Sequence, residues 1–428
     1  MIAPVLLLAQ VHQDLFARIY GGRNDDWVYS IVACSDGGFA LAGYTRSFGS
    51  DGADFLLLKL NPLGELEWAL TAGEQGSEYA NALAQTADGG FALAGYTRSF
   101  GAGGSDILVV KLNQDGELGW ARTIGGTGNE CAYSIAQLPD GSLLLAGYTT
   151  SFGSGGSDIL LLEMSEDGDL RWAKTIGGPG SESASFLALT NEGGFFLAGY
   201  GQGVSGTLPL VIRLDPSAGV LWAKSFSAGE GSYIRSAIAW MDGYLLAGWV
   251  RGKGSDPDAL VVRLNEKGGL VWARAFGGKG YDWASCLTVL PGGGFGLAGC
   301  ISFGHYNFLI MGLSGAGELE WAKTFGSPGW DAASCMAVSR DQRIAVAGYT
   351  SGFGIGGDDI LLLELSPDGE YPGCAVDCPV RIRAPSVRSQ KVSVESKPCF
   401  PAISSPELTI RKVPVSAVDV CAPPLPDQ

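Results

Sequence analysis

Fourteen residues, DGGFALAGYTRSFG, occur twice in this chain, at 36–49 and again at 88–101, 52 positions apart. Looser copies of the LAGY core recur at almost the same period and start at Leu41, Leu93, Leu145, Leu197, Leu246, Leu297 and Val346. This period constrains the fold more than any other feature, because it means that one unit of about 50 residues is repeated seven times.

Each unit contains four short apolar segments that Gly, Asp, Asn and Ser clusters separate. The first unit has Tyr29–Ala33, the LAGY segment, Asp54–Leu60 and a segment around Trp68. No helical period persists, and the 66 glycines are about twice the usual ~7% share, as expected of a fold rich in turns. Four short strands repeated at this period predict an all-β fold, a seven-bladed β-propeller of four-stranded antiparallel blades.

The Trp segment occurs only six times, at Trp68, Trp120, Trp172, Trp222, Trp272 and Trp321, and the last unit stops without it. The missing copy is at the start of the chain, where the segment at 14–22 matches the one at 118–126 and has Phe16 in the Trp position. We therefore expect residues 14–370 to form the propeller, with an N-terminal strand that closes the last blade and protects its edge.

The units resemble the SBBP-type β-propeller repeat proteins that bacteria and archaea secrete. The similar sequence begins at the glycines before each first strand and continues through the motifs DGGF, LAGYT, SFG and GELxWAR. The resemblance covers roughly residues 14–370 and implies a propeller and export, whereas most members of that family have no assigned function. The Gly-x-x-x-Trp spacing is also similar to the tryptophan-docking motif of quinone-dependent dehydrogenases, which implies that each Trp packs on glycine-rich backbone of a neighbouring blade.

Charge and apolar runs exclude some partners. Residues 1–370 carry 21 basic and 39 acidic residues, so nucleic acid is not expected as a partner. No apolar run reaches the ~18 residues of a transmembrane span. Residues 1–13 are apolar but lack a basic start, so they are interpreted either as a truncated signal or as a disordered start. With the family resemblance, this favours an extracellular or cell-surface location.

Residues 371–428 differ in composition and hold half of the 20 prolines. Their short alternating runs predict a small β module or an extended segment that pairs with an exposed edge. Four cysteines there are disulfide candidates, namely Cys374, Cys378, Cys399 and Cys421. Five others are scattered in the blades, and Cys286 and Cys335 occupy the same position in adjacent units, which allows an inter-blade disulfide.

A carboxylate lies ten residues after most Trp-type positions, in the loop that leads into the next unit. The six acids are Asp26, Glu78, Glu130, Glu182, Asp282 and Asp331, with Ser232 in the seventh place. The topology puts them on one face of the disc, called here the acid-ring face. We interpret them as structural groups that accept hydrogen bonds from loop N–H groups. The alternative is a calcium site or a cradle for a basic partner, but one acid per blade spreads the oxygens that calcium needs at one point. No metal or cofactor is predicted.

Blades one to three are nearly interchangeable, and later blades depart from the repeat on the acid-ring face. Because the consensus builds the scaffold, we expect a ligand to bind where copies differ. The candidate ligand-binding residues are Tyr233, Arg235, Arg251, Lys253, Tyr281, Trp283, His305, Tyr306 and Trp330. Aromatic rings beside a few cations suit a sugar or a protein surface.

With two histidines and no recognisable triad, no catalytic residue is predicted. The favoured function is a secreted, non-catalytic binding or adhesion module for a glycan or protein. The alternatives are an envelope component attached through its C-terminal segment, and then an enzyme.

Overall fold

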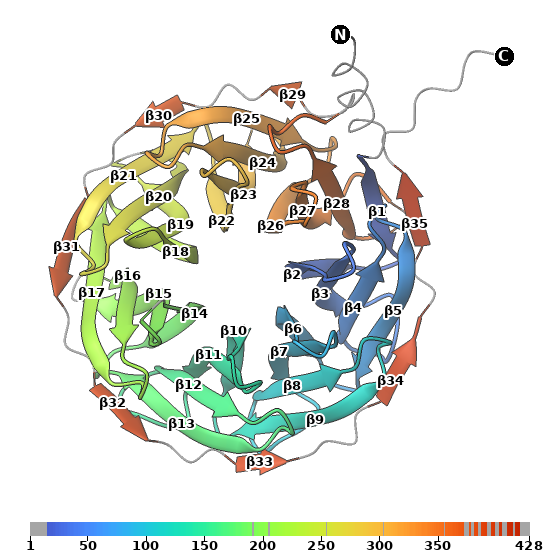
Figure 1. Ribbon diagram of the computed structural model, residues 1–428, viewed down its shortest axis with the longest axis vertical. Helices are drawn as coiled ribbons and strands as arrows, with labels where there is room; N and C mark the ends of the chain where they lie inside the picture. The colour runs from blue at the N-terminus through green and yellow to red at the C-terminus, as the bar shows by residue number, and fades with distance from the viewer. Residues whose placement is uncertain are drawn as a thin grey trace, which may run out of the picture.

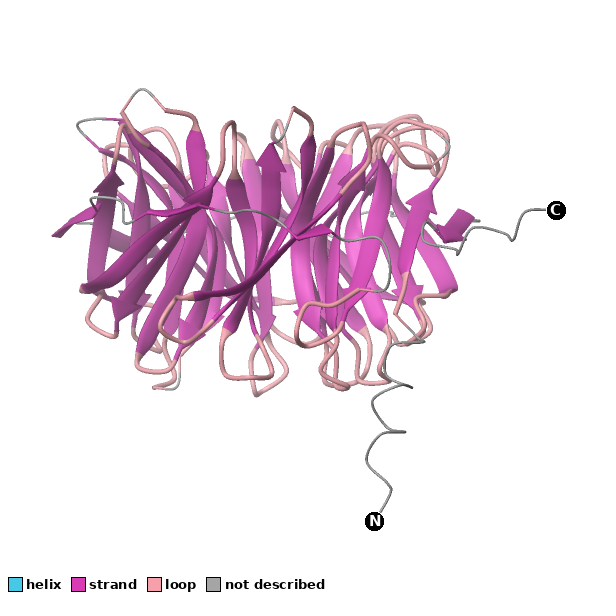
Figure 2. Ribbon diagram, turned by 90° about the horizontal axis from the view of Figure 1, so that it is seen from above, coloured by secondary structure: helices cyan, strands magenta, loops and turns pink. Residues whose placement is uncertain are grey.

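The computed structural model describes residues 15–371 apart from 191, 204–205, 254, 303 and 355, together with 376–377, 381–383, 387–391, 395–398, 402–404, 409–413 and 416–419. In this part of the chain there are strands and no helices. The strands form seven antiparallel sheets arranged as blades around a central channel, which confirms the predicted seven-bladed β-propeller (Figure 1). Seen from the side in Figure 2, the blades form a disc with loops on both faces.

Four strands of each blade follow in chain order from the channel outward. The innermost strands are β2 (Asp26–Ala33), β6 (Glu78–Gln85), β10 (Glu130–Gln137), β14 (Glu182–Leu189), β18 (Gly231–Trp240), β22 (Trp283–Val289) and β26 (Asp331–Val338). The second strands are β3 (Phe39–Thr45), β7 (Phe91–Thr97), β11 (Leu143–Thr149), β15 (Phe195–Gly203), β19 (Gly243–Arg251), β23 (Phe295–Ser302) and β27 (Ile344–Thr350). The third strands are β4 (Asp54–Leu60), β8 (Asp106–Leu112), β12 (Asp158–Met164), β16 (Gly206–Leu214), β20 (Pro257–Asn265), β24 (Tyr306–Leu313) and β28 (Asp359–Leu365).

The fourth strands carry the Trp segment in six blades, and the N-terminal segment supplies the seventh. They are β5 (Leu66–Gly73), β9 (Leu118–Gly125), β13 (Leu170–Gly177), β17 (Val220–Ala228), β21 (Leu270–Gly277), β25 (Leu319–Phe325) and, in blade 7, β1 (Ala17–Gly21). Strand β1 pairs with β28 in the register Ala17↔Leu363 to Tyr20↔Ile360. The prediction that an N-terminal strand closes the last blade is therefore confirmed.

The C-terminal segment adds a fifth strand to the outside of every blade. Its strands are β29 (Val376–Asp377), β30 (Arg381–Arg383), β31 (Val387–Lys391), β32 (Glu395–Pro398), β33 (Ala402–Ser404), β34 (Thr409–Lys412) and β35 (Ser416–Asp419). They pair in turn with the fourth strands of blades 6, 5, 4, 3, 2, 1 and 7. The segment thus runs backward around the whole ring, as the red arrows on the rim of Figure 1 show. We call it the outer belt.

The apolar cores lie between the blades, and the Trp segment fixes how neighbouring blades pack. The Trp120 ring of blade 2 lies on Gly168 of blade 3, whose φ is +82°, and a Cβ on that glycine would come 2.8 Å from the ring. Equivalent contacts join Trp68 to Gly116 and Trp321 to Gly369. Phe16 makes the same contact with Gly64 of blade 1, so the packing continues across the point where the ring closes.

The glycine of each LAGY segment allows the second strand to approach the innermost strand closely, and this affects the channel wall. Gly43 faces the innermost strand so closely that a Cβ there would come 2.8 Å from the carbonyl carbon of Trp27. At this point β2 has a β-bulge, because the register shifts between Val28 and Ser30 and leaves Tyr29 without a partner. All seven innermost strands have this bulge opposite the equivalent glycine. The repeated motif therefore places one additional residue of each blade, the bulge residue, on the channel wall.

Candidate functional site

The seven bulge residues line the central channel, which encloses a volume of about 620 Å³. They differ from blade to blade although the backbone is repeated, and in order they are Tyr29, Asn81, Tyr133, Ser185, Arg235, Ser285 and Ser334. The wall is therefore asymmetric. Blades 1 to 3 contribute two tyrosines and an amide, whereas blades 4 to 7 contribute three serines and one arginine.

Arg235 is the only charged residue among those that line the channel. Its side chain is exposed to the channel, yet the surrounding walls displace enough water to lower the pKa of the guanidinium. Within the described part of the chain it forms no ion pair, and its guanidinium carbon lies over the face of Trp283, 5.7 Å from the ring centroid. The guanidinium therefore has donors that remain available to a ligand.

An aromatic path leads from Arg235 to the surface of blades 6 and 7. Trp283 lies 5.4 Å from Tyr306, and Tyr306 lies 5.2 Å from Trp330, both between ring centroids. Trp330 is 60% exposed, which is unusual for an indole. We call these four residues, Arg235, Trp283, Tyr306 and Trp330, the rim cluster. The structure thus places four of the predicted ligand-binding residues in one continuous group.

The other predicted residues lie around this group. Tyr233 lines the channel and stacks on Trp249 with a centroid distance of 6.5 Å. Tyr281 is 47% exposed in the loop before β22. Arg251, Lys253 and His305 are exposed on the same face, and no described side-chain contact joins them to the rim cluster.

The six acids of the predicted ring are buried, with exposed fractions between 0% and 6%. Each accepts a hydrogen bond from the backbone N–H four residues earlier. Examples are Gly126 N to Glu130 at 2.7 Å and Ser327 N to Asp331 at 2.6 Å. Glu78 and Glu130 also accept from the threonines that end the adjacent LAGYT segments, Thr97 and Thr149, at 2.7 Å. In this geometry the carboxylates hold the blade-to-blade loops, and they do not present charge to a partner.

Burial changes the acidity of these groups. It raises the pKa of Asp26, of Glu182 and, to about 6, of Asp282, although hydrogen bonds from loop N–H groups oppose the effect. A second carboxylate lies beside two of them, Asp158 beside Glu182 and the half-buried Asp258 beside Asp282, and its charge raises the pKa further. Within the described residues, no group of three or more His, Cys, Asp or Glu side chains could hold a metal ion.

The cysteines of the blades are free thiols. The inter-blade disulfide considered for Cys286 and Cys335 is wrong, because both remain unpaired. Burial raises the pKa of Cys286 to about 11, so the thiol stays protonated and unreactive at neutral pH. The disulfide candidates Cys374, Cys378, Cys399 and Cys421 lie outside the described residues, as do residues 1–13.

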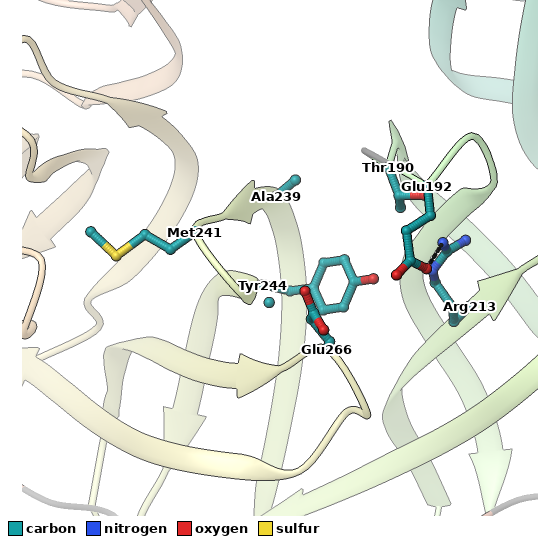
Figure 3. Close-up of a pocket in the computed structure, with 8 residues that line it drawn as sticks. Thr190, Glu192, Arg213, Ala239, Met241, Tyr244 and Glu266 are labelled. Carbon is teal, nitrogen blue, oxygen red and sulfur yellow. Dashed lines mark hydrogen bonds and ion pairs between the residues drawn. The ribbon is translucent and has the colours of Figure 1, made fainter.

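A second hollow lies between blades 4 and 5, on the face opposite the acid ring (Figure 3). Arg213 there is paired with Glu192 at 3.2 Å, and Tyr244 and Glu266 line the other side. Its volume of about 60 Å³ has room for water molecules rather than for a ligand. The channel and its rim are therefore the better candidate site.

In the part of the chain that the structure describes, no helix is long and apolar enough to cross a membrane.

Comparison with known proteins does not assign this chain to a family. No family model matches the chain, so the resemblance to SBBP-type repeat proteins is not confirmed. A stretch of 139 residues is 29% identical to the regulatory protein FlaEY of Caulobacter vibrioides, and it covers 29% of this chain and 14% of that protein. The match therefore spans only about one seventh of the relative.

Solved structures with a similar shape include Sqt1 of Chaetomium thermophilum, at 12% identity and a TM-score of 0.46, covering 84% of this chain and 88% of that one. Another crystal structure of that protein contains the N-terminus of ribosomal protein L10, at 12% identity, a TM-score of 0.43 and coverage of 84% and 98%. The periplasmic gluconolactonase PpgL of Pseudomonas aeruginosa has 11% identity, a TM-score of 0.42 and coverage of 86% and 99%. These similarities do not decide whether the chain is an enzyme.

Proposed function

We propose that this protein is a non-catalytic binding protein whose ligand docks on the rim cluster of the acid-ring face. The observation that supports this most directly is the path from the unpaired Arg235 through Trp283 and Tyr306 to the exposed Trp330. Aromatic residues and arginine dominate the binding energy of protein interfaces, and the rim cluster combines the 60% exposed indole of Trp330 with the guanidinium of Arg235.

Two further features favour binding over catalysis and over a purely structural role. Among the described residues that line the channel there is no histidine and no carboxylate, the side chains that most often act as general acids and bases. The described strands of the C-terminal segment are already paired with the blades, which leaves less of it for attachment to an envelope. The extracellular location predicted from the family resemblance stays a prediction.

The ligand we favour is a protein surface, and a glycan is the alternative outcome of the test. Purified chain is applied to arrays of proteins and glycans, and the ligand found is titrated against Trp283→Ala/Trp330→Ala. If these rings are hot spots, the double change weakens binding by about 2 kcal/mol or more. Leu63→Ala is the matched control, because Leu63 is 45% exposed on the opposite face of a regular blade. Equal losses from both variants, or no loss from the Trp pair with the fold intact, would place the site elsewhere.

A further inference from the structure

We propose that the channel contains a second site, for a small sugar acid whose carboxylate pairs with Arg235, and that this site shares only Arg235 with the rim cluster. This site lies inside the channel, on the bulge residues, and it does not depend on whether a partner docks on the exposed Trp330. Its specificity comes from the side chains that the bulges place on the wall: Ser185, Arg235, Ser285 and Ser334.

The charge of the channel wall indicates an anion. The propeller is strongly acidic, yet the channel is lined by one cation and by no carboxylate. No described carboxylate pairs with the guanidinium, although the surrounding channel wall excludes part of the water that would hydrate this group. A charge in such a place is stabilised by a partner of opposite sign, and arginine binds a carboxylate through two parallel hydrogen bonds. One arginine balances one negative charge, which fits a monocarboxylate better than a phosphate of nearly two charges.

The neighbours of Arg235 indicate what the rest of the ligand contains. Ser285 and Ser334 follow it in the next two blades, and Ser185 precedes it. The hydroxyls of these three serines form no side-chain hydrogen bond with the described residues, and all three are partly exposed to the channel. Hydroxyl groups both donate and accept, so together they match a ligand with several hydroxyls of its own. A carboxylate that carries hydroxyls is a sugar acid.

The size of the channel agrees with this class of ligand. Its volume of about 620 Å³ lies within the ~300–1,000 Å³ of small-molecule sites. The short serine side chains leave this space open on the side of blades 4 to 7. Tyr29 and Tyr133 stand on the other side and offer ring faces and hydroxyls to the ligand. The seven-strand wall limits the ligand to a small molecule that enters through the channel mouth.

The test uses the full chain with D-glucuronate and D-gluconate as ligands and D-glucose as the neutral reference. Calorimetry and saturation-transfer NMR should detect binding of at least one acid and at least tenfold weaker binding of glucose. Arg235→Gln should weaken binding of the acid tenfold or more, whereas Arg98→Gln, which changes an exposed arginine in the β7–β8 loop of the same face, should leave it unchanged. Ser285→Phe should also weaken binding with Arg235 in place, because the ring would occupy space that the short serine side chain leaves open in the channel.

Thermal melting confirms that each variant is folded, and Arg235→Lys keeps the charge if Arg235→Gln does not fold. No binding of either acid by the parent would overturn the proposal. So would binding that glucose equals, or binding that survives both Arg235→Gln and Ser285→Phe. Loss of partner binding in Trp283→Ala/Trp330→Ala with glucuronate binding intact is the result expected if the two sites are separate.

Discussion

The buried carboxylates at the start of the innermost strands hold the loops through hydrogen bonds, and they also make stability depend on pH. Burial favours the protonated form, so the pKa of Asp26 and Asp282 is higher in the folded chain than in the unfolded chain. The same holds for Asp54 and Asp106, which begin the third strands β4 and β8. The folded state therefore binds more protons than the unfolded state, and its stability falls as pH rises through the folded pKa values.

For Asp282 this window lies between the ordinary value of 3.8 and about 6. We expect the thermal midpoint to be higher at pH 5 than at pH 8. Asp282→Asn should reduce the difference in stability between pH 5 and pH 8 by on the order of 1 kcal/mol, because the amide does not titrate. Its single oxygen can replace only one of the two carboxylate oxygens that accept from Gly278 and Ser302, so we expect lower stability at both pH values. The control is Asp140→Asn, since Arg171 and Ser142 lower the pKa of Asp140 and its titration falls below this window. Unchanged slopes in Asp282→Asn would contradict the prediction.

Most of the bulge residues could not be predicted from the sequence as residues of the channel wall. Arg235 and Tyr233 were identified because they depart from the repeat, whereas Tyr29, Asn81, Tyr133, Ser285 and Ser334 were not. A bulge shifts the two-residue alternation of a strand by one position, so the pattern assigns its residue to the wrong face. The glycine of LAGY was a usable signal, since its missing side chain marks where the opposite strand comes close.

At the scale of single strands, β1 is the element whose loss should matter most. With the adjoining Phe16, it joins the two ends of the repeat array through β28 on one side and the contact of Phe16 with Gly64 on the other, in addition to direct contacts of blade 1 with blade 7 such as the Trp27–Tyr349 stack. Deletion of residues 1–22 removes both, so we expect a melting transition that is lower and less cooperative. A synthetic peptide of residues 15–22, added in excess, should restore part of the stability because it binds only the folded ring.

The result that would contradict this role is a truncated protein with the melting temperature and cooperativity of the parent. A lowered transition that the peptide does not shift would mean that the lost stability comes from elsewhere in the deleted segment. The position of β1 was predictable because its sequence matches the Trp segments, and a mismatch in their number pointed to the other end of the chain.

At the scale of the whole molecule, the outer belt links all seven blades. Its pairings connect residues that are very far apart in sequence, such as Arg18 with Asp419. Its strands have between two and five residues, too few for a clear alternation, and the partner of each is set by the closed ring. For these reasons the sequence indicated short strands after residue 371 but did not indicate where they bind.

Truncation after Glu370 removes the outer belt and leaves the edges of the fourth strands unpaired. We expect lower thermal stability, and we expect amides in β9 and β13 to lose hydrogen-exchange protection by about tenfold or more, since exchange reports local opening. Exposed edges also pair with other copies, so self-association at high concentration should increase.

The matched control is truncation after Ser404, which removes only β34 and β35 and should deprotect β5 and β1 while β13 and β17 stay protected. Uniform protection in both truncated chains would mean that the outer belt does not stabilise the ring in solution, whereas the graded pattern would assign each of its strands to its own blade.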